Sequence, residues 1–166
     1  MNKWDRRYMR RAWEASTWSK DPSTQVGAVI CDAQHRPVSS GCNGLPQGMN
    51  DDERVLQDRE LKYACILHAE ENAILFAHRD LTDCVIYTYP VPPCASCASK
   101  IRQSGITRVV APSTCDEALM ERWAKSLGAA TLVFGDAVTL ELVDLENLVD
   151  PDLMLPWWLS ATMKPE

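Results

Sequence analysis

The chain has 166 residues, of which 46% are hydrophobic and 24% charged, an ordinary composition for one soluble globular domain. Its 23 acidic and 17 basic residues give a net charge of −6, whereas proteins that grip a nucleic-acid backbone usually carry concentrated positive charge. No apolar run approaches the roughly 18 residues that a membrane span needs, and the charged start does not resemble a signal peptide. We therefore expect a single cytoplasmic domain over residues 1–166, with residues 145–166 as a C-terminal tail and with neither a membrane nor a polynucleotide partner.

The first part of the chain predicts a helix followed by a hairpin. Residues 3–18 carry apolar side chains at three- and four-residue steps, which indicates an amphipathic helix. We expect its core-facing stripe to consist of Trp4, Tyr8, Ala12, Ala15 and Trp18. Residues 25–31 and 37–41 are typical of two strands joined by a turn, and residues 43–60 of an irregular loop.

The rest of the chain alternates helices with strands. Helical patterns cover residues 67–77, 94–104 and 116–134, and strand patterns cover residues 83–89, 106–111 and 138–143. With the hairpin, this order predicts an α/β fold: three layers, α/β/α, around one central mixed five-stranded sheet.

Two short motifs at helix starts carry the chemistry. They are His-Ala-Glu at residues 68–70 and Pro-Cys-Ala-Ser-Cys at residues 93–97. One imidazole and two thiolates form a three-ligand zinc site whose fourth position stays open for water, which is the catalytic type. A carboxylate beside that water moves protons without binding the metal. We predict Zn²⁺ as the cofactor, with His68, Cys94 and Cys97 as its ligands and Glu70 as the catalytic acid and base.

Each of these residues taken alone has a plainer interpretation. A histidine at a helix end is commonly structural, and a Cys-x-x-Cys pair often belongs to a structural zinc knuckle. A structural site uses four ligands, however, and this region offers three ligands and an acid, which favours catalysis. Three other cysteines, Cys31, Cys65 and Cys84, stand in apolar runs and are expected to be buried thiols.

The motifs resemble the cytidine and deoxycytidylate deaminase superfamily, whose H-x-E and P-C-x-x-C signature they match. Residues 21–29 and 41–48 are most similar to its deoxycytidylate (dCMP) deaminase branch. The resemblance implies a cytidine deaminase-like fold, hydrolysis of dCMP to dUMP and ammonia, and a homo-oligomer, either a dimer or a hexamer. The alternatives are a deaminase of another nucleobase, nucleoside or modified nucleotide (guanine, cytidine or a transfer-RNA adenosine) and a non-catalytic zinc-binding assembly module.

The resemblance also implies contacts with a small-molecule nucleotide. Asn43 is expected to hydrogen-bond the deoxyribose, or else to serve only as a turn residue, and the backbone near Ala69 to approach the base. Residues 45–62 are expected to help enclose the nucleotide. A phosphate needs a cation or a set of backbone amides. The candidate cations are Arg54, Arg59 and Lys62, unless they pair with neighbouring acids, and then Lys100 and Arg102.

Overall fold

A computed structural model describes residues 1–50, 53–113 and 117–144, so the tail expected over residues 145–166 lies outside the described part of the chain. The elements run in the order α1 (Lys3–Ser16), β1 (Gly27–Cys31), β2 (Pro37–Cys42), α2 (Glu53–Gln57), α3 (Arg59–Cys65), α4 (Ala69–Leu75), β3 (Val85–Tyr89), α5 (Ala95–Gln103), β4 (Arg108–Pro112), α6 (Glu117–Phe134) and β5 (Thr139–Val143).

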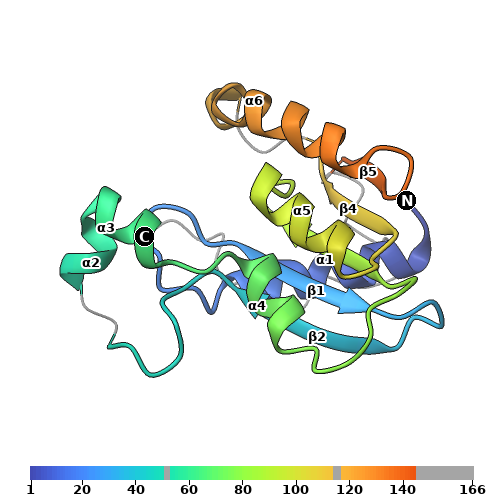
Figure 1. Ribbon diagram of the computed structural model, residues 1–166, viewed down its shortest axis with the longest axis horizontal. Coiled ribbons are helices and arrows are strands. Elements are labelled where there is room, and N and C mark those ends of the chain that lie inside the picture. Colours follow the sequence, from blue (N-terminus) through green and yellow to red (C-terminus); the bar gives the residue numbers. More distant parts are fainter. Residues whose placement is uncertain (51–52, 114–116, 145–166) are drawn as a thin grey trace, which may run out of the picture.

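The five strands form one mixed sheet in the order β2-β1-β3-β4-β5 (Figure 1). Strand β1 is antiparallel to both β2 and β3, while β3, β4 and β5 run parallel to one another. The antiparallel pair β1–β2 is joined by a short turn, and the parallel strands by the crossover helices α5 and α6, as parallel pairing requires. The predicted mixed five-stranded sheet is confirmed.

Helices cover both faces of the sheet, which confirms the three layers (Figure 1). Alternate side chains of β1 explain how one strand serves two cores, because successive residues of a strand point to opposite faces. Ala28 and Ile30 face the core under α4, α5 and α6, whereas Val29 and Cys31 face the core under α1. All five residues of β1 are buried, as expected for a strand that lies between two cores.

Helix α1 differs from the predicted aromatic stripe at both ends. Its buried apolar residues are Tyr8, Met9, Ala12 and Ala15. Trp18 is 67% exposed because the helix ends at Ser16, so the spacing that put Trp18 on the buried face no longer applies. Trp4 is 38% exposed and stacks on the His35 ring at 4.8 Å between centroids, at the rim of the core. The prediction of two core tryptophans is therefore wrong.

A buried ionic network holds the start of α1 against the parallel strands. Asp5 is 1% exposed, and its carboxylate accepts hydrogen bonds from Arg108 Nη1 at 2.8 Å and from the Tyr87 hydroxyl at 2.9 Å. Arg108 also pairs with Glu141 of β5 at 2.7 Å. Burial alone would raise the pKa of Asp5, but these bonds, above all that from Arg108, bring it below its ordinary value. One arginine thus joins α1, β4 and β5.

Residues 43–60, expected to be a loop, contain helix α2 and the beginning of helix α3. Asp58 caps α3, because its Oδ1 accepts from the amides of Glu60 and Leu61 at 3.0 Å each. The two helices project away from the sheet at the left of Figure 1.

No described helix is long and apolar enough to span a membrane.

Candidate active site

Two helix starts meet to form the candidate metal centre. His68 is the N-cap residue of α4, and its backbone N–H donates to Glu71 Oε2 at 2.8 Å, which fixes the entry into the helix. Cys94 is the N-cap residue of α5, and its Sγ accepts from the Cys97 amide at 3.5 Å. Strand β3 leads into α5 through a proline-rich turn, so the centre lies beyond the carboxyl end of a parallel strand, where ligands of α/β proteins commonly bind.

The three predicted ligands come together with the spacing of a zinc site. His68 Nδ1 lies 3.6 Å from Cys94 Sγ and 3.3 Å from Cys97 Sγ, and all three donor atoms fall within 4.8 Å of one another. Ordinary Zn–N and Zn–S bond lengths in a tetrahedral site place a nitrogen and a sulfur about 3.6 Å apart. An imidazole and two thiols therefore fit this ion in both chemistry and distance.

The side chains of the two cysteines shift each other's pKa in opposite directions. A hydrogen bond from the Cys97 thiol, helped by His68, lowers the pKa of Cys94 to about 4. The reciprocal bond to Cys94, together with burial, raises the pKa of Cys97. The bond to Cys94 also raises the pKa of His68. Because a metal ligand must be deprotonated, binding of a cation here would be coupled to the release of protons.

Glu70 stands in the first turn of α4, two residues after His68. It is 4% exposed, and burial raises the pKa of its carboxyl. A carboxyl group with a raised pKa takes up and releases protons closer to neutral pH, which suits a general acid and base. The acid predicted from the sequence is therefore buried and lies close to the three candidate ligands.

His68, Glu70 and Cys94 line a cavity of about 180 Å³. The rest of its lining comes from the loop before β1, the residue that follows β2, the helices α3 and α4, the turn before α5, and α6. Its lining includes Asn43, Lys62, Ala69 and Trp123.

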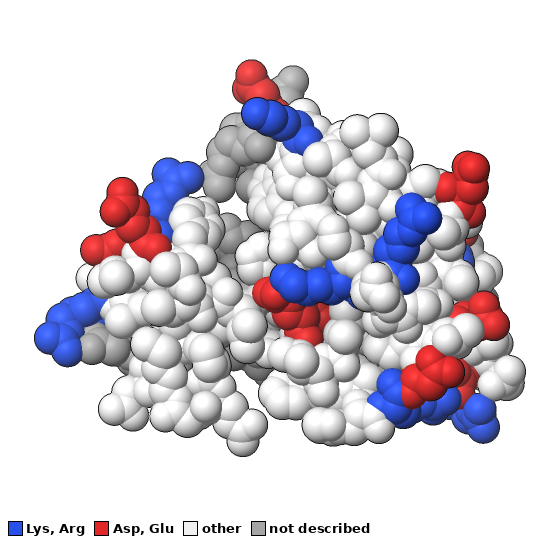
Figure 2. Space-filling model, in the orientation of Figure 1, with Lys and Arg blue, Asp and Glu red and all other residues white. Residues whose placement is uncertain are grey.

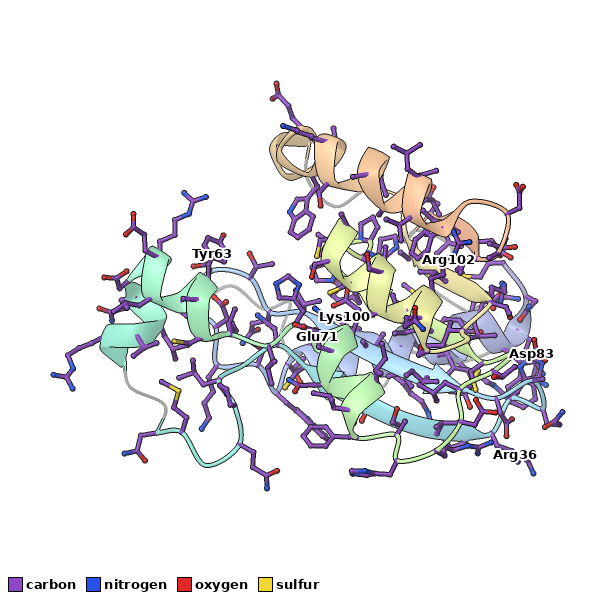
Figure 3. The ribbon with its side chains drawn as sticks, in the orientation of Figure 1. Arg36, Tyr63, Glu71, Asp83, Lys100 and Arg102 are labelled. Atoms are coloured by element: carbon purple, nitrogen blue, oxygen red, sulfur yellow. The ribbon has the colours of Figure 1, made fainter. Side chains whose placement is uncertain are left out.

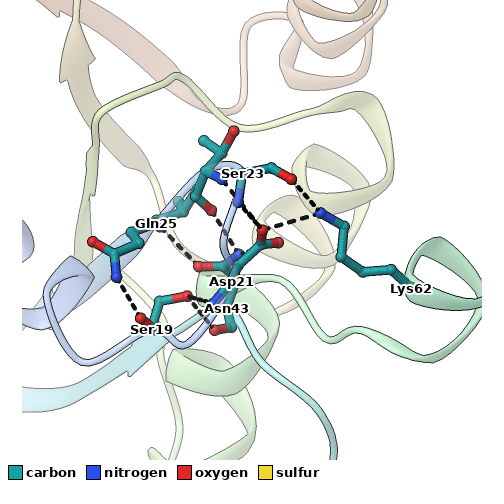
Figure 4. Close-up of polar contacts among 8 residues, drawn as sticks. Ser19, Asp21, Ser23, Gln25, Asn43 and Lys62 are labelled. Atoms are coloured by element: carbon teal, nitrogen blue, oxygen red, sulfur yellow. Dashed lines mark hydrogen bonds and ion pairs between the residues drawn. The ribbon is translucent and has the colours of Figure 1, made fainter. Parts of the chain in front are cut away.

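Asn43 lines this cavity, but the protein itself holds its amide. Its Oδ1 accepts from the Val26 amide at 2.7 Å, and its Nδ2 donates to the Thr24 carbonyl at 2.9 Å and to Asp21 Oδ2 at 3.3 Å (Figure 4). Both amide hydrogens are therefore engaged within the described residues, and the second lone pair of Oδ1 is left for an incoming donor. Asn43 is more than a turn residue, because it joins β2 to the loop before β1.

The three cations expected near a phosphate occupy different places. Lys62 is 5% exposed and lines the cavity, where its Nζ donates to Asp21 Oδ1 at 3.0 Å. Arg54 and Arg59 are exposed and stand outside the described lining, and the Arg59 guanidinium lies 5.6 Å from the centre of the Tyr63 ring.

The two next candidates, Lys100 and Arg102, lie on α5. Figure 3 shows Lys100 and Glu71 facing each other, and the two form an ion pair. Arg102 points instead towards the end of α6, where it donates to the Val133 carbonyl at 2.6 Å. Both side chains therefore join neighbouring helices.

Several lining residues were not predicted from the sequence. Asp21, Ser23 and Thr24 belong to residues 21–29, which we identified only as similar to the dCMP deaminase branch, and Trp123 lies in the helical pattern of residues 116–134. An aspartate before proline in a turn gave a local signal for backbone capping, which Asp21 provides to the amide of Ser23 at 2.7 Å. Its long-range partners left no such signal.

Residues 2–113 match the family described as the cytidine and deoxycytidylate deaminase zinc-binding region. An uncharacterized deaminase in the luxG 3′ region of Aliivibrio fischeri is 45% identical over 137 residues, which cover 82% of this chain and 90% of that protein. The deoxycytidylate deaminase of Mus musculus is 37% identical over 113 residues, which cover 64% of this chain and 63% of that protein. The matched part thus spans less than two thirds of the mouse relative.

A solved structure shows the same fold. The dCMP deaminase of the cyanophage S-TIM5, crystallised in complex with dCMP and dUMP, superposes with a TM-score of 0.66 and 20% sequence identity. The match covers 86% of this chain and 99% of the phage chain. The cytidine deaminase-like fold expected from the sequence is confirmed.

Proposed function

The chain belongs to the cytidine and deoxycytidylate deaminase family and is a hydrolytic deaminase, and we propose that it converts dCMP and water to dUMP and ammonia. One observation carries the proposal. The donor atoms of His68, Cys94 and Cys97 converge within 4.8 Å, and His68 and Cys94 line a cavity that buried Glu70 also lines. A metal centre without an adjacent proton carrier would fit an assembly module better.

We assign the metal to His68 Nδ1 and to the sulfurs of Cys94 and Cys97. Zinc held there would supply a bound water whose pKa is lowered from about 15.7 towards about 7. His68 and Cys94, the N-cap residues of two helices, would hold the ion at the lining of the cavity, and Cys97 would hold it from the first turn of α5.

Glu70 moves the protons of the reaction. Its carboxylate accepts one proton from the attacking water and delivers it to ring N3, as oxygen bonds to C4 of the cytosine. It then carries the second proton to the exocyclic amine, which leaves as ammonia when the C4–N4 bond breaks. Burial favours this role because it raises the pKa of Glu70 and so reduces the difference in pKa between Glu70 and the groups with which it exchanges protons.

The cavity supports a base and a sugar rather than a long polymer. Ala69 is fully buried in its wall, so the backbone there can approach the base closely, and Trp123 adds an apolar surface. The remaining lone pair of Asn43 Oδ1 suits a hydroxyl donor such as that of deoxyribose. We expect the phosphate at the mouth of the cavity, near the helices that carry Arg54 and Arg59.

Ammonia release from a substrate panel tests the proposal. The purified, zinc-loaded chain is incubated with dCMP, deoxycytidine, cytidine, guanine and transfer RNA at equal concentrations. We expect dCMP to give the highest kcat/KM. Turnover of guanine or transfer RNA without turnover of dCMP would reassign the substrate, and a zinc-loaded chain inactive on the whole panel would indicate the assembly module.

A further inference from the structure

Helices α2 and α3, which we call the lobe, are attached to the rest of the protein at few points. In the described part of the chain they pack against each other and share no comparable contact with another helix or strand. The chain enters and leaves the lobe through a narrow neck, where Gly44 and Leu67 exchange backbone hydrogen bonds of 3.1 and 2.9 Å. Lys62 and Tyr63 of the lobe nevertheless line the cavity. The position of the lobe therefore sets one wall of the site.

Beyond the neck, a buried ion pair holds the lobe to the body. Lys62 Nζ lies 3.0 Å from Asp21 Oδ1 and 2.9 Å from Ser23 Oγ (Figure 4). Both charged side chains are only 6% exposed. Separating such a pair costs free energy, because each charge is then left unpaired in a poorly solvated site. The pair therefore behaves as a latch between two segments 41 residues apart in the sequence.

The same carboxylate reaches the substrate-binding amide. Asp21 Oδ1 accepts from Lys62 and from the amide of Ser23, while Asp21 Oδ2 accepts from Asn43 Nδ2 at 3.3 Å. The orientation of Asn43 thus depends on an aspartate whose own position depends on Lys62. Asn43 keeps its acceptor available only while its Nδ2 faces Asp21 and Thr24.

We propose that Lys62 is a positioning residue, which latches the lobe over the cavity and orients Asn43 through Asp21, and that it is not the ligand of the substrate phosphate. Its charge is already matched by Asp21, and two of its three N–H groups are engaged. The inference rests on the proposed function for the identity of the substrate. It predicts that Lys62 matters equally for ligands with and without a phosphate.

Hydrogen exchange tests the latch without any substrate. We compare Lys62→Met with Lys125→Met, the same chemical change at an exposed position on α6. Amides of residues 53–65 should exchange about tenfold faster or more in Lys62→Met and at the wild-type rate in Lys125→Met, because local opening no longer breaks an ion pair. Lys62→Arg, which keeps the charge, should recover part of the protection. Unchanged exchange of the lobe in Lys62→Met would overturn the latch.

Ligand binding tests the positioning role. Dissociation constants of dUMP and of deoxyuridine are measured by calorimetry for the same variants. Lys62→Met should weaken both ligands by a similar factor, about 10- to 100-fold, because the variant loses the charge-assisted hydrogen bond from Lys62 to Asp21 that holds Asn43 and the lobe in place. Weakening of dUMP alone would make Lys62 the phosphate ligand, and no weakening of either would remove it from the site; each result overturns the inference.

A second variant covers the case in which Lys62→Met does not fold. If Lys62→Met fails to fold, the double variant Asp21→Asn/Lys62→Met removes the unpaired charge, and the same comparison of dUMP with deoxyuridine is made on it. The proposed function is judged on the wild type alone, by its turnover of dCMP, whereas the inference is judged on ratios of variant to wild type and on exchange in the absence of substrate. Failure of one is therefore distinguishable from failure of the other.

Discussion

At the scale of single residues, the two sulfurs of the candidate metal centre are coupled to each other and differ in burial. The hydrogen bond between them lowers the pKa of Cys94 to about 4 and raises the pKa of Cys97. Cys97 is fully buried and Cys94 is partly exposed to the cavity. Cys94 is therefore the sulfur that a cation in the cavity would reach directly, and both thiols would have to be deprotonated to bind it.

Replacing the partly exposed sulfur should abolish metal binding. Cys94→Ser substitutes a hydroxyl that does not ionise near neutral pH, so the site loses one of its two thiolate ligands. After dialysis against a chelator, we expect one zinc per wild-type chain and almost none in the variant, measured by atomic absorption. Cys65→Ser is the matched control, since Cys65 is half-buried and stands outside the ligand group. Full, tightly held zinc in Cys94→Ser would refute this ligand set.

At the scale of elements, the position of α4 depends on its close approach to β2. Gly41 of β2 lies directly under α4, and a Cβ there would stand 2.6 Å from both the Ala69 carbonyl oxygen and the Ala73 amide nitrogen. Asn72 strengthens the contact by donating from Nδ2 to the Cys42 carbonyl at 2.8 Å. The helix that begins at His68 and carries Glu70 is therefore placed by a glycine of the edge strand.

Gly41→Ala should push α4 away from the sheet. Overpacking against backbone atoms costs about 1–3 kcal/mol, so the free energy of unfolding measured in urea should fall by that amount. Turnover should fall as well, since the shift moves Glu70 relative to Cys94 and Cys97. Gly128→Ala is the control, because a Cβ at Gly128 meets nothing within 4 Å. A Gly41→Ala variant as stable and as active as the wild type would contradict the proposed dependence of α4 on this contact.

Some elements could be predicted from the sequence and others could not. The strands were predictable from the alternation of apolar residues, and the ligand motifs from spacings of two or three residues at helix starts, because both signals are local in the sequence. Helices α2 and α3 were missed because charged and polar residues interrupt any apolar period over residues 53–65, leaving only the cap at Asp58. The bond between Lys62 and Asp21 spans 41 residues, and nothing in either local sequence marks the other as its partner.

At the scale of the whole molecule, charge agrees with a small substrate. The chain has a net charge of −6, and Figure 2 shows Lys and Arg side chains scattered among Asp and Glu on the visible face rather than gathered into one basic patch. Binding to a nucleic-acid backbone draws its affinity from such a patch. The cavity beside the metal centre instead offers about 180 Å³ and a buried proton carrier. That residues 1–166 form a single domain remains a prediction.

The most direct test of the catalytic centre is dUMP formation from dCMP by Glu70→Gln and by the wild type, each loaded with one zinc per chain. The amide keeps the size of the side chain but cannot carry protons, so kcat should fall by about 10²–10⁴-fold with zinc content and unfolding temperature unchanged. A variant that forms dUMP within about threefold of the wild-type rate would show that another group moves the proton, and the proposed centre would be wrong.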